Sequence, residues 1–516
     1  MASEYELKRL ENIRRNEEQL ALLNLPHLAA TTIKLPPKKK PKRKSVDSAN
    51  TREKKPKILR RSTRISGIPS NELVSLNENS LASRIDTSLG SQIEPSRTSG
   101  DISFADCLLN DTETFDAKEF TGLIKALTPP EASLLSQPPL AIKTLAKLKI
   151  THAPIKVTKK RITSLACHPS STSARGLVCA SDTIGEIGCL VTGTDVKRAA
   201  KTEDEEDEEE EAGRLFRFRP HQAQASCLKF NSSGLLLSSS YDGSVRSLDL
   251  SAEAFTEVFV DPDERGQTWL AVYNETSIMS CDNKGKVNHI DLRSNSRSSR
   301  ATYTRQLHDK KISALDVHPD GVTLATASND GTVAIWDIRK LSGSTSKPKA
   351  LQSFSFSRAV SGSFFSPDGK NLLCTSYDDT IRILTVSSEG KEITSPKLWP
   401  QRNIRHNNQT GRWISKFRAM WAPNGTAFTV GHMGRQVDLF TLTPPSGTGS
   451  AGAANSSKNS KGSGGSGKML KGPPGTTLVS VGDVNRLTAI PGVSIFHSQT
   501  PQLITGNASG YVCLWA

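Results

Sequence analysis

From about residue 150 onward, apolar and polar residues alternate in short runs. The clearest example is LATASNDGTVAIWDIRK, residues 324–340, which alternates, turns on Asn-Asp-Gly and alternates again. A period of two indicates half-buried β-strands, and a turn of this type between two such runs predicts a hairpin. We therefore expect an all-β domain over residues 150–516.

A Gly-x-Val or Gly-x-Ile register recurs just after the turns of this region. The copies begin at Gly185, Gly243, Gly285, Gly331 and Gly510, with Asp379 in place of one glycine and a looser copy from Gly434 to Val437. Four of the six steps between copies lie between 42 and 55 residues. WD repeats recur about every 40–45 residues, with four strands in each propeller blade.

Two longer steps contain insertions, an acidic one at 201–212 and a Gly/Ser-rich one at 443–475. Seven copies predict a seven-bladed WD-repeat β-propeller. One blade cannot bury both faces of its sheet, so the ring must close to be stable. The segment 155–158, just before the first blade, is expected to supply the closing outer strand.

The first 149 residues lack this alternation of apolar and polar positions. Residues 1–26 predict a charged helix, because apolar residues fall near one face and a proline ends the pattern. That helix either docks onto a partner or is simply solvated. Residues 27–149 are rich in Pro, Lys, Ser and Thr, and we expect them to be disordered. No apolar run is long enough to cross a bilayer, and the charged start does not resemble a secretory signal.

The formal net charge is +15. Residues 34–64 hold 14 lysines and arginines, including the clusters PKKKPKRK at 37–44 and REKKPKILRRSTR at 52–64. Such clusters act as nuclear-import signals or phosphate-binding tails, or are merely solvated. The acidic run at 203–211 offsets part of this charge. The residues outside both the basic stretch 34–64 and this acidic run still carry a net charge of +12. We therefore expect a nuclear protein with a polyanionic partner.

Nothing in the sequence predicts catalysis, a cofactor or a metal. The eight cysteines are scattered without a CxxC pair, which favours small buried residues in a reducing compartment. GSGGSGK at 462–468 fits the letters of a phosphate-binding loop, but Met469 replaces the Ser/Thr, no strand precedes it and no helix follows it. No HExxH, paired-carboxylate or Cys/His pattern was found.

In the clearest repeat, four side chains can link loop, turn and strands through hydrogen bonds. A buried indole N–H requires an acceptor, so the structural interpretation is favoured over a catalytic one for the histidine and the aspartate. The predicted tetrad is His308, Ser328, Asp330 and Trp336.

The segment 308–340, HDKKISALDVHPDGVTLATASNDGTVAIWDIRK, resembles the fourth blade of the WD-repeat DNA damage-binding family. Three further stretches strengthen the resemblance: RLENIRRNEEQL (9–20), SSYDGSVRSLDL (239–250) and RHNNQTGRWISKFRAMW (405–421). Together they resemble the fungal branch most. The resemblance implies binding to single- and double-stranded DNA with a preference for ultraviolet-damaged DNA, a nuclear location and a role in the damage response, without catalysis.

Lysines and arginines at one mouth of the propeller are the candidates for phosphate contacts, because neutralised phosphates release counterions. The candidates are Lys159, Lys160, Arg161, Lys310 and Lys311, with Arg246 and Arg382 from two related turns. The resemblance places the lysines at 310 and 311 on the DNA-facing side. Any one of these residues can equally be an ordinary surface charge.

RHNNQTGRW at 405–413 is polar and carries no WD pattern. Its amides can bond base edges or phosphates, its arginine can bind phosphate, and its tryptophan can stack on an unstacked base. The candidates are His406, Asn407, Asn408, Gln409, Arg412 and Trp413, with His432 and Arg435 as weaker ones. The alternative is that Trp413 packs between blades. A Phe-Gln-His wedge known from a relative is absent here.

Trp-Asp-Ile-Arg at 336–339 has a second interpretation. In WD-repeat substrate receptors, this pattern is associated with docking to the adaptor of a cullin-based ubiquitin ligase, and it also occurs in propellers without that partner. The candidates are Asp337 and Arg339, since an arginine can make a bidentate contact that lysine cannot. A scaffold for a ligase, for histones or for other chromatin proteins is therefore the alternative function.

Overall fold

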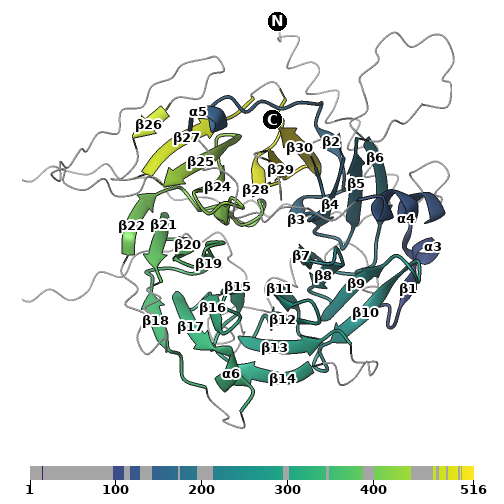
Figure 1. Ribbon diagram of the computed structural model, residues 1–516, viewed down its shortest axis with the longest axis horizontal. Coiled ribbons are helices and arrows are strands. Elements are labelled where there is room, and N and C mark those ends of the chain that lie inside the picture. Colours follow the sequence, from purple (N-terminus) through teal and green to yellow (C-terminus); the bar gives the residue numbers. More distant parts are fainter. Residues whose placement is uncertain are drawn as a thin grey trace, which may run out of the picture. The chain divides into compact units, whose positions relative to one another are not determined.

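The computed structural model describes residues 97–109, 117–127, 142–172, 175–193, 213–293, 301–343, 348–386, 400–442, 469–471, 476–483, 486–497 and 502–516, with Arg14 and Thr500. In this part of the chain, the strands form seven antiparallel sheets around a central axis (Figure 1). The predicted seven-bladed propeller is confirmed. Apart from Arg14, the helix predicted at 1–26 lies outside the described residues, as does the acidic insertion.

Each blade begins with an innermost strand and proceeds outward. Blade 1 contains β3 (Ile162–Cys167), β4 (Gly176–Asp182), β5 (Ile187–Thr192) and β6 (Gly213–Phe218). Blade 2 contains β7 (Ala225–Phe230), β8 (Leu236–Ser240), β9 (Ser244–Asp249) and β10 (Ala254–Val260), with β1 (Ile102–Ser103) added outside. Blade 3 contains β11 (Gln267–Asn274), β12 (Ser277–Asp282), β13 (Lys286–Asp291) and β14 (Ala301–Gln306). Blade 4 contains β15 (Ile312–Val317), β16 (Thr323–Ser328), β17 (Thr332–Asp337) and β18 (Gln352–Ser355).

The remaining blades continue the ring. Blade 5 contains β19 (Val360–Phe365), β20 (Asn371–Ser376), β21 (Thr380–Thr385) and β22 (Pro400–Arg405). Blade 6 contains β23 (Met420–Trp421), β24 (Ala427–His432), β25 (Gln436–Leu442), β27 (Thr476–Val481) and β26 (Met469–Lys471), the last from the Gly/Ser-rich insertion. Blade 7 contains β28 (Pro491–Phe496), β29 (Leu503–Asn507), β30 (Tyr511–Trp515) and β2 (Ile155–Lys156).

The ring closes as expected from the sequence. β2 pairs with β30 in antiparallel register, with Ile155 opposite Val512, so an early segment completes the last blade. Blades pack face to face, and strands such as β16 are buried along their whole length. Four helices are described: α3 (Phe104–Cys107), α4 (Ala117–Lys125), α5 (Ile142–Leu145) and α6 (Ile338–Leu341). None of the described helices is long and apolar enough to span a membrane.

The recurring glycine stands where the turn between the second and third strands of a blade needs a left-handed backbone. Gly285 has φ of 91°, and a Cβ there would lie 2.0 Å from the carbonyl oxygen of His308. Glycine is the residue that adopts this conformation without steric cost. Asp379 and Arg435 occupy the equivalent turns of blades 5 and 6 with φ of 60° and 58°. These two residues thus adopt the left-handed backbone that glycine adopts in the other blades, and the turn is unchanged.

The tetrad forms with one correction. His308 Nδ1 lies 3.0 Å from Asp330 Oδ2, but His308 Nε2 lies 2.8 Å from Thr326 Oγ1, to which Trp336 Nε1 also donates at 2.8 Å. Thr326 rather than Ser328 is therefore the shared hydroxyl. Trp336 pairs opposite Leu324, so its indole reaches the diagonal neighbour Thr326, whereas Ser328 lies farther toward the turn.

The disorder predicted for residues 27–149 is wrong for three stretches. Segment 97–109 adds β1 to blade 2, and the buried rings of Phe104 and Phe120 pack together at 5.7 Å between centroids. α3 and β1 lie beside β10 at the rim of the ring, and α4 lies nearby (Figure 1). Residues 142–149 approach blade 7, where the Lys149 and Ala516 backbones exchange hydrogen bonds. Burial of the aromatic rings offsets the conformational entropy that a polar segment loses when it becomes ordered, which composition alone does not reveal.

The cysteines behave as expected from their scattered spacing. All eight are free thiols; seven are buried, and Cys167 is partly exposed. Burial raises the pKa of the Cys281 and Cys374 thiols, so neither favours the reactive thiolate. Within the described residues, no group of three or more His, Cys, Asp or Glu side chains is arranged to hold a metal ion.

Candidate nucleic-acid interface

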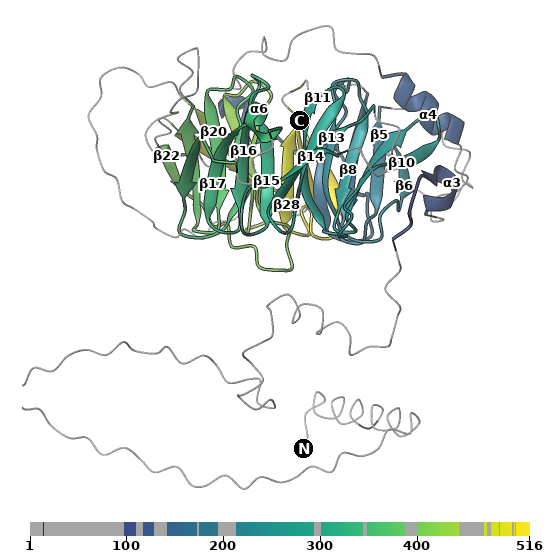
Figure 2. The same cartoon turned by 90° about the horizontal axis from the view of Figure 1, so that it is seen from below.

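We call one face of the ring the top face. It carries the loops that lead into the innermost strands, including 157–161, 307–311 and 406–415, and the turns between second and third strands, such as 329–331. β17 runs from that turn to α6, so α6 lies on the opposite face. Figure 2 shows the ring edge-on, with the top face turned downward. In this view α6 lies at the upper edge of the ring, and the green loop between β22 and β23 projects beyond the lower edge.

Loop 406–415 is anchored at its base by buried polar contacts. Asn408 Nδ2 donates to the carbonyl oxygens of Ser376 and Thr380 at 2.9 and 3.2 Å. His406 Nδ1 lies 2.7 Å from Asn408 Oδ1, and its Nε2 lies 3.3 Å from Asp438 Oδ2. Because His406 and Asn408 are buried, they hold the loop in place and do not face a ligand. This corrects the prediction that they contact DNA.

The tip of the loop is exposed. Trp413 has 75% of its surface exposed and is the large apolar residue that stands out on the described surface. The Arg412 guanidinium carbon lies 5.0 Å from its ring centroid, within cation–π range. The alternative that Trp413 packs between blades is therefore wrong. Asn407 is also exposed, whereas Gln409 Nε2 donates to Asp379 Oδ2 at 2.7 Å, which orients that amide toward the protein.

The loop reaches across blade 7 to blade 1. Arg161 Nη1 donates to the Arg412 carbonyl oxygen at 2.9 Å, and Ser415 Oγ donates to the Ile162 carbonyl oxygen. The structure thus brings together two stretches that were predicted separately. Lys159 and Lys160, next to Arg161, are exposed, and their backbone N–H groups bond to Glu186 and Asp182.

A second basic stretch lies on the loops of blades 4 and 5. Lys310 and Arg358 occupy equivalent loops and are exposed. Lys311 is half-buried, bonds through Nζ to the Tyr241 hydroxyl and lies 4.7 Å from the centroid of that ring. Sequence reasoning missed Arg358, although its place in the repeat, two residues before β19, matches that of Lys310 before β15.

The two arginines predicted from related turns do not present free charge. Arg246 is 1% exposed; its guanidinium donates to the carbonyl oxygens of Thr98 and Gly100 at 2.6 Å. This corrects its assignment as a phosphate contact, since it instead anchors the segment before β1. Arg382 donates to Asp378 at 2.8 Å and stacks over Phe356.

The weaker candidates lie on the turn of blade 6. Arg435 is exposed, and His432 Nδ1 accepts from the Gly434 N–H at 2.9 Å. On the opposite face, Arg339 makes a bidentate contact with Asp337 at 3.1 and 3.0 Å, with 71% of its side chain exposed. Asp337 also caps α6 by accepting from the Arg339 N–H. The predicted adaptor residues therefore lie on the face opposite the predicted DNA residues.

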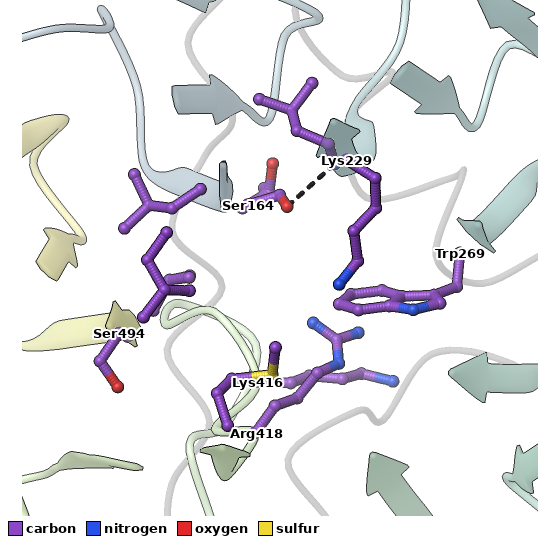
Figure 3. A pocket seen from close by; sticks show the side chains of 13 residues that line it. Ser164, Lys229, Trp269, Lys416, Arg418 and Ser494 are labelled. Carbon is purple, nitrogen blue, oxygen red and sulfur yellow. Dashed lines mark hydrogen bonds between the residues drawn. The ribbon is translucent and has the colours of Figure 1, made fainter. Parts of the chain in front are cut away.

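Sequence reasoning also missed Lys229, Lys416 and Arg418, which line a pocket in the central channel beside Trp269 (Figure 3). The signal was present in KFRAMW at 416–421, where the cations alternate with buried Phe417 and Ala419. Alternation of this kind on an innermost strand predicts that the cations face the channel.

Comparison with known proteins gives a consistent result. A family described as nucleolar protein 10-like, N-terminal domain, matches residues 207–411. DNA damage-binding protein CMR1 of Phaeosphaeria nodorum is 32% identical over 380 residues, covering 70% of this chain and 66% of the relative. CMR1 of Neurospora crassa is 26% identical over 560 residues, covering 99% and 98%. WD repeat-containing protein 76 of Xenopus laevis is 29% identical over 456 residues, covering 85% and 72%.

Proposed function

Since the chain belongs to the WD-repeat family that includes the DNA damage-binding protein CMR1 and WD repeat-containing protein 76, we propose that it binds DNA, with preference for damaged DNA. We further propose that it binds single- and double-stranded DNA, prefers ultraviolet-damaged duplex and acts in the nucleus. It acts by binding rather than by catalysis. The polybasic clusters at 37–44 and 52–64, outside the described residues, support nuclear import and added phosphate contacts.

The exposed Trp413 beside Arg412 is the observation that carries this proposal. An indole held on an anchored loop offers a stacking surface to a base that has left the helical stack, at about 1–3 kcal/mol. The neighbouring guanidinium supplies a phosphate contact. Damage lowers the cost of unstacking a base, so a protein that depends on stacking gains preference for lesions.

Exposed cations on the same face support the phosphate contribution. Lys159, Lys160, Lys310 and Arg358 project from loops of blades 1, 4 and 5. Each neutralised phosphate contributes through counterion release, and the contribution falls as salt rises. The top face is therefore suited to a polyphosphate chain of any sequence, and Trp413 supplies the discrimination.

The test uses the full chain in fluorescence-anisotropy titrations with intact duplex, irradiated duplex and single-stranded DNA over a range of salt. Lys310→Glu should weaken binding to all three and reduce the salt dependence. Lys340→Glu is the matched control, because it changes the charge equally but lies on α6, on the opposite face, with its side chain 74% exposed. Equal effects of the two variants, or equal affinity of the wild type for intact and irradiated duplex, would contradict the proposal.

The exposed, pre-oriented Arg339 supports a second candidate function, docking to a ubiquitin-ligase adaptor or a chromatin protein. Its carboxylate partner fixes the guanidinium plane, which reduces the entropy lost in a bidentate contact. Arg339→Ala should abolish co-purification with a cullin-ligase adaptor while DNA affinity stays unchanged. Unchanged co-purification would remove Arg339 from this role.

A further inference from the structure

The central channel gathers positive charge that the DNA proposal does not use. Lys229, Lys416 and Arg418 gather near the indole of Trp269, and Ser164 and Ser494 lie across the pocket from that indole (Figure 3). They come from β7, from the segment before β23 and from the neighbouring innermost strands. The pocket is small and opens to solvent. That space suits a small ion or group rather than a duplex.

Arg418 is fixed across the channel. Its Nε donates to the Ser361 carbonyl oxygen at 3.0 Å and its Nη2 to the Ser313 carbonyl oxygen at 3.3 Å. The guanidinium carbon lies 4.4 Å from the Trp269 ring centroid. Two of its nitrogens are thus committed to neutral acceptors, and the positive charge has no carboxylate partner among the described residues.

Lys416 is half-buried and borders the open channel. Its Nζ lies 6.0 Å from the ring centroid of Tyr377, and the charges nearest to it are Lys311 and Arg418. Desolvation, followed by repulsion from those two cations, holds the pKa of the Lys416 ammonium well below its usual range. No acidic side chain of the described residues pairs with it.

Lys229 differs, because it has a carboxylate neighbour. Asp316 on β15 is close enough for Lys229 to lower the pKa of its carboxyl, although desolvation outweighs this effect and raises that pKa to about 6. The Asp316 carboxylate also accepts from the Phe365 N–H at 2.8 Å. Among the cations that line the pocket, the charges without a carboxylate neighbour are therefore those of Lys416 and Arg418.

Two partly buried cations that line one pocket without a counter-ion are unfavourable unless an anion joins them. We propose that the channel binds one phosphate group, as free phosphate or as a phosphomonoester, in the pocket lined by Lys229, Lys416 and Arg418. The two ammonium groups donate to its oxygens, as does the part of the Arg418 guanidinium that is not bonded to the strands. This site is separate from the DNA-contacting surface at Trp413.

Binding at this site should be linked to protons. An anion beside Lys416 favours its ammonium form over the amine, so binding takes up protons and weakens as pH rises. Burial raises the pKa of the nearby Tyr377 hydroxyl, so that group does not produce this sign. A dianionic phosphomonoester gains more from this site than a phosphodiester, which carries a single charge.

The experiment is isothermal titration calorimetry of the full chain with inorganic phosphate, in two buffers of different ionisation enthalpy. Wild type should bind, and the buffer dependence should report proton uptake. Lys416→Met, of similar length and without charge, should weaken binding about tenfold to a hundredfold. Its thermal midpoint without phosphate should equal or exceed that of wild type, because a buried charge is removed. Lys340→Met is the matched control on α6.

Lys229→Met provides a second variant at a residue that lines the same pocket, and it should also weaken binding. A parallel arm compares single-stranded oligonucleotides with a 5′-phosphate and a 5′-hydroxyl. A phosphate-dependent gain that Lys416→Met removes identifies a DNA end as the source; phosphate binding without that gain identifies a free phosphorylated compound. No binding of either probe by wild type, or equal binding by Lys416→Met, overturns the proposal. Affinity for intact and irradiated duplex is measured separately, so the two proposals fail independently.

Discussion

Replacing Trp413 by alanine tests the proposed function most directly, because it removes the stacking surface with little cost to the fold. Three quarters of the side chain is exposed. A tryptophan buries up to about 250 Å² at about 25 cal/mol per Å², so the covered quarter contributes at most about 1.5 kcal/mol to folding. Loss of base stacking should cost about 1–3 kcal/mol in binding, or about 5-fold to 150-fold in affinity.

The assay is fluorescence anisotropy with full-length wild type, Trp413→Ala and Trp413→Phe, at one salt concentration, on irradiated duplex, intact duplex and single-stranded DNA. The alanine variant should lose most on the irradiated duplex and on the single strand, where bases are free to stack. Phenylalanine should recover part of that affinity. If the alanine variant, with an unchanged thermal midpoint, binds irradiated duplex within twofold of wild type, then Trp413 does not recognise lesions.

Three further predictions concern the scaffold. Thr326→Val leaves the buried Trp336 indole N–H without its acceptor and His308 Nε2 without its hydrogen-bond partner. It should lower the free energy of unfolding by about 1–3 kcal/mol for each unsatisfied group, whereas Ser328→Ala should cost less, as measured by urea unfolding. Asp316 has a carboxyl pKa raised to about 6 by desolvation, so the folded protein holds more protons than the unfolded chain between about pH 4 and 6, and stability falls as pH rises through that window. Asp316→Asn should remove this fall, on the order of 2 kcal/mol, in urea unfolding at several pH values; an unaltered difference between pH 4 and 6 would contradict it. Arg246→Leu should release segment 97–109 to limited proteolysis while DNA affinity stays within twofold; continued protection would show that the arginine is not its anchor.

The blade count and ring closure could be predicted because their determinants are local. A turn that needs a left-handed backbone selects glycine, and seven such turns mark seven blades. Asp379 shows that the register survives a substitution when the flanking apolar positions persist. The closing strand followed from its place just before the first blade.

The error at Ser328 shows what local pattern cannot decide. Thr326 and Ser328 lie on the same side of β16, and both carry a hydroxyl. The choice depends on how far the Trp336 indole reaches diagonally across the sheet, which is a property of the packed blade. Residue type alone could not distinguish the two positions.

The error at Arg246 has a different cause. The Arg246 guanidinium donates to the backbone carbonyl oxygens of residues 98 and 100 and to Glu257. Because its contacts with residues 98 and 100 use the backbone alone, they require no particular side chains at those two positions. A polar stretch whose order depends on such contacts resembles a disordered one in composition. By contrast, alternation in residues 416–421 carried enough information to place Lys416 and Arg418 in the channel.

The pairing of β2 with β30 also sets the order of events during synthesis. Residue 155 leaves the ribosome long before its partner at 512 is made. At about 5–20 residues per second, the interval is roughly 20–70 s. Throughout that time, the first six blades can assemble one against the next, but the final sheet lacks its C-terminal strand. A chain truncated before Tyr511 would never acquire the strand that completes the last blade. The open ring would then keep two unpaired strand edges exposed to neighbouring chains.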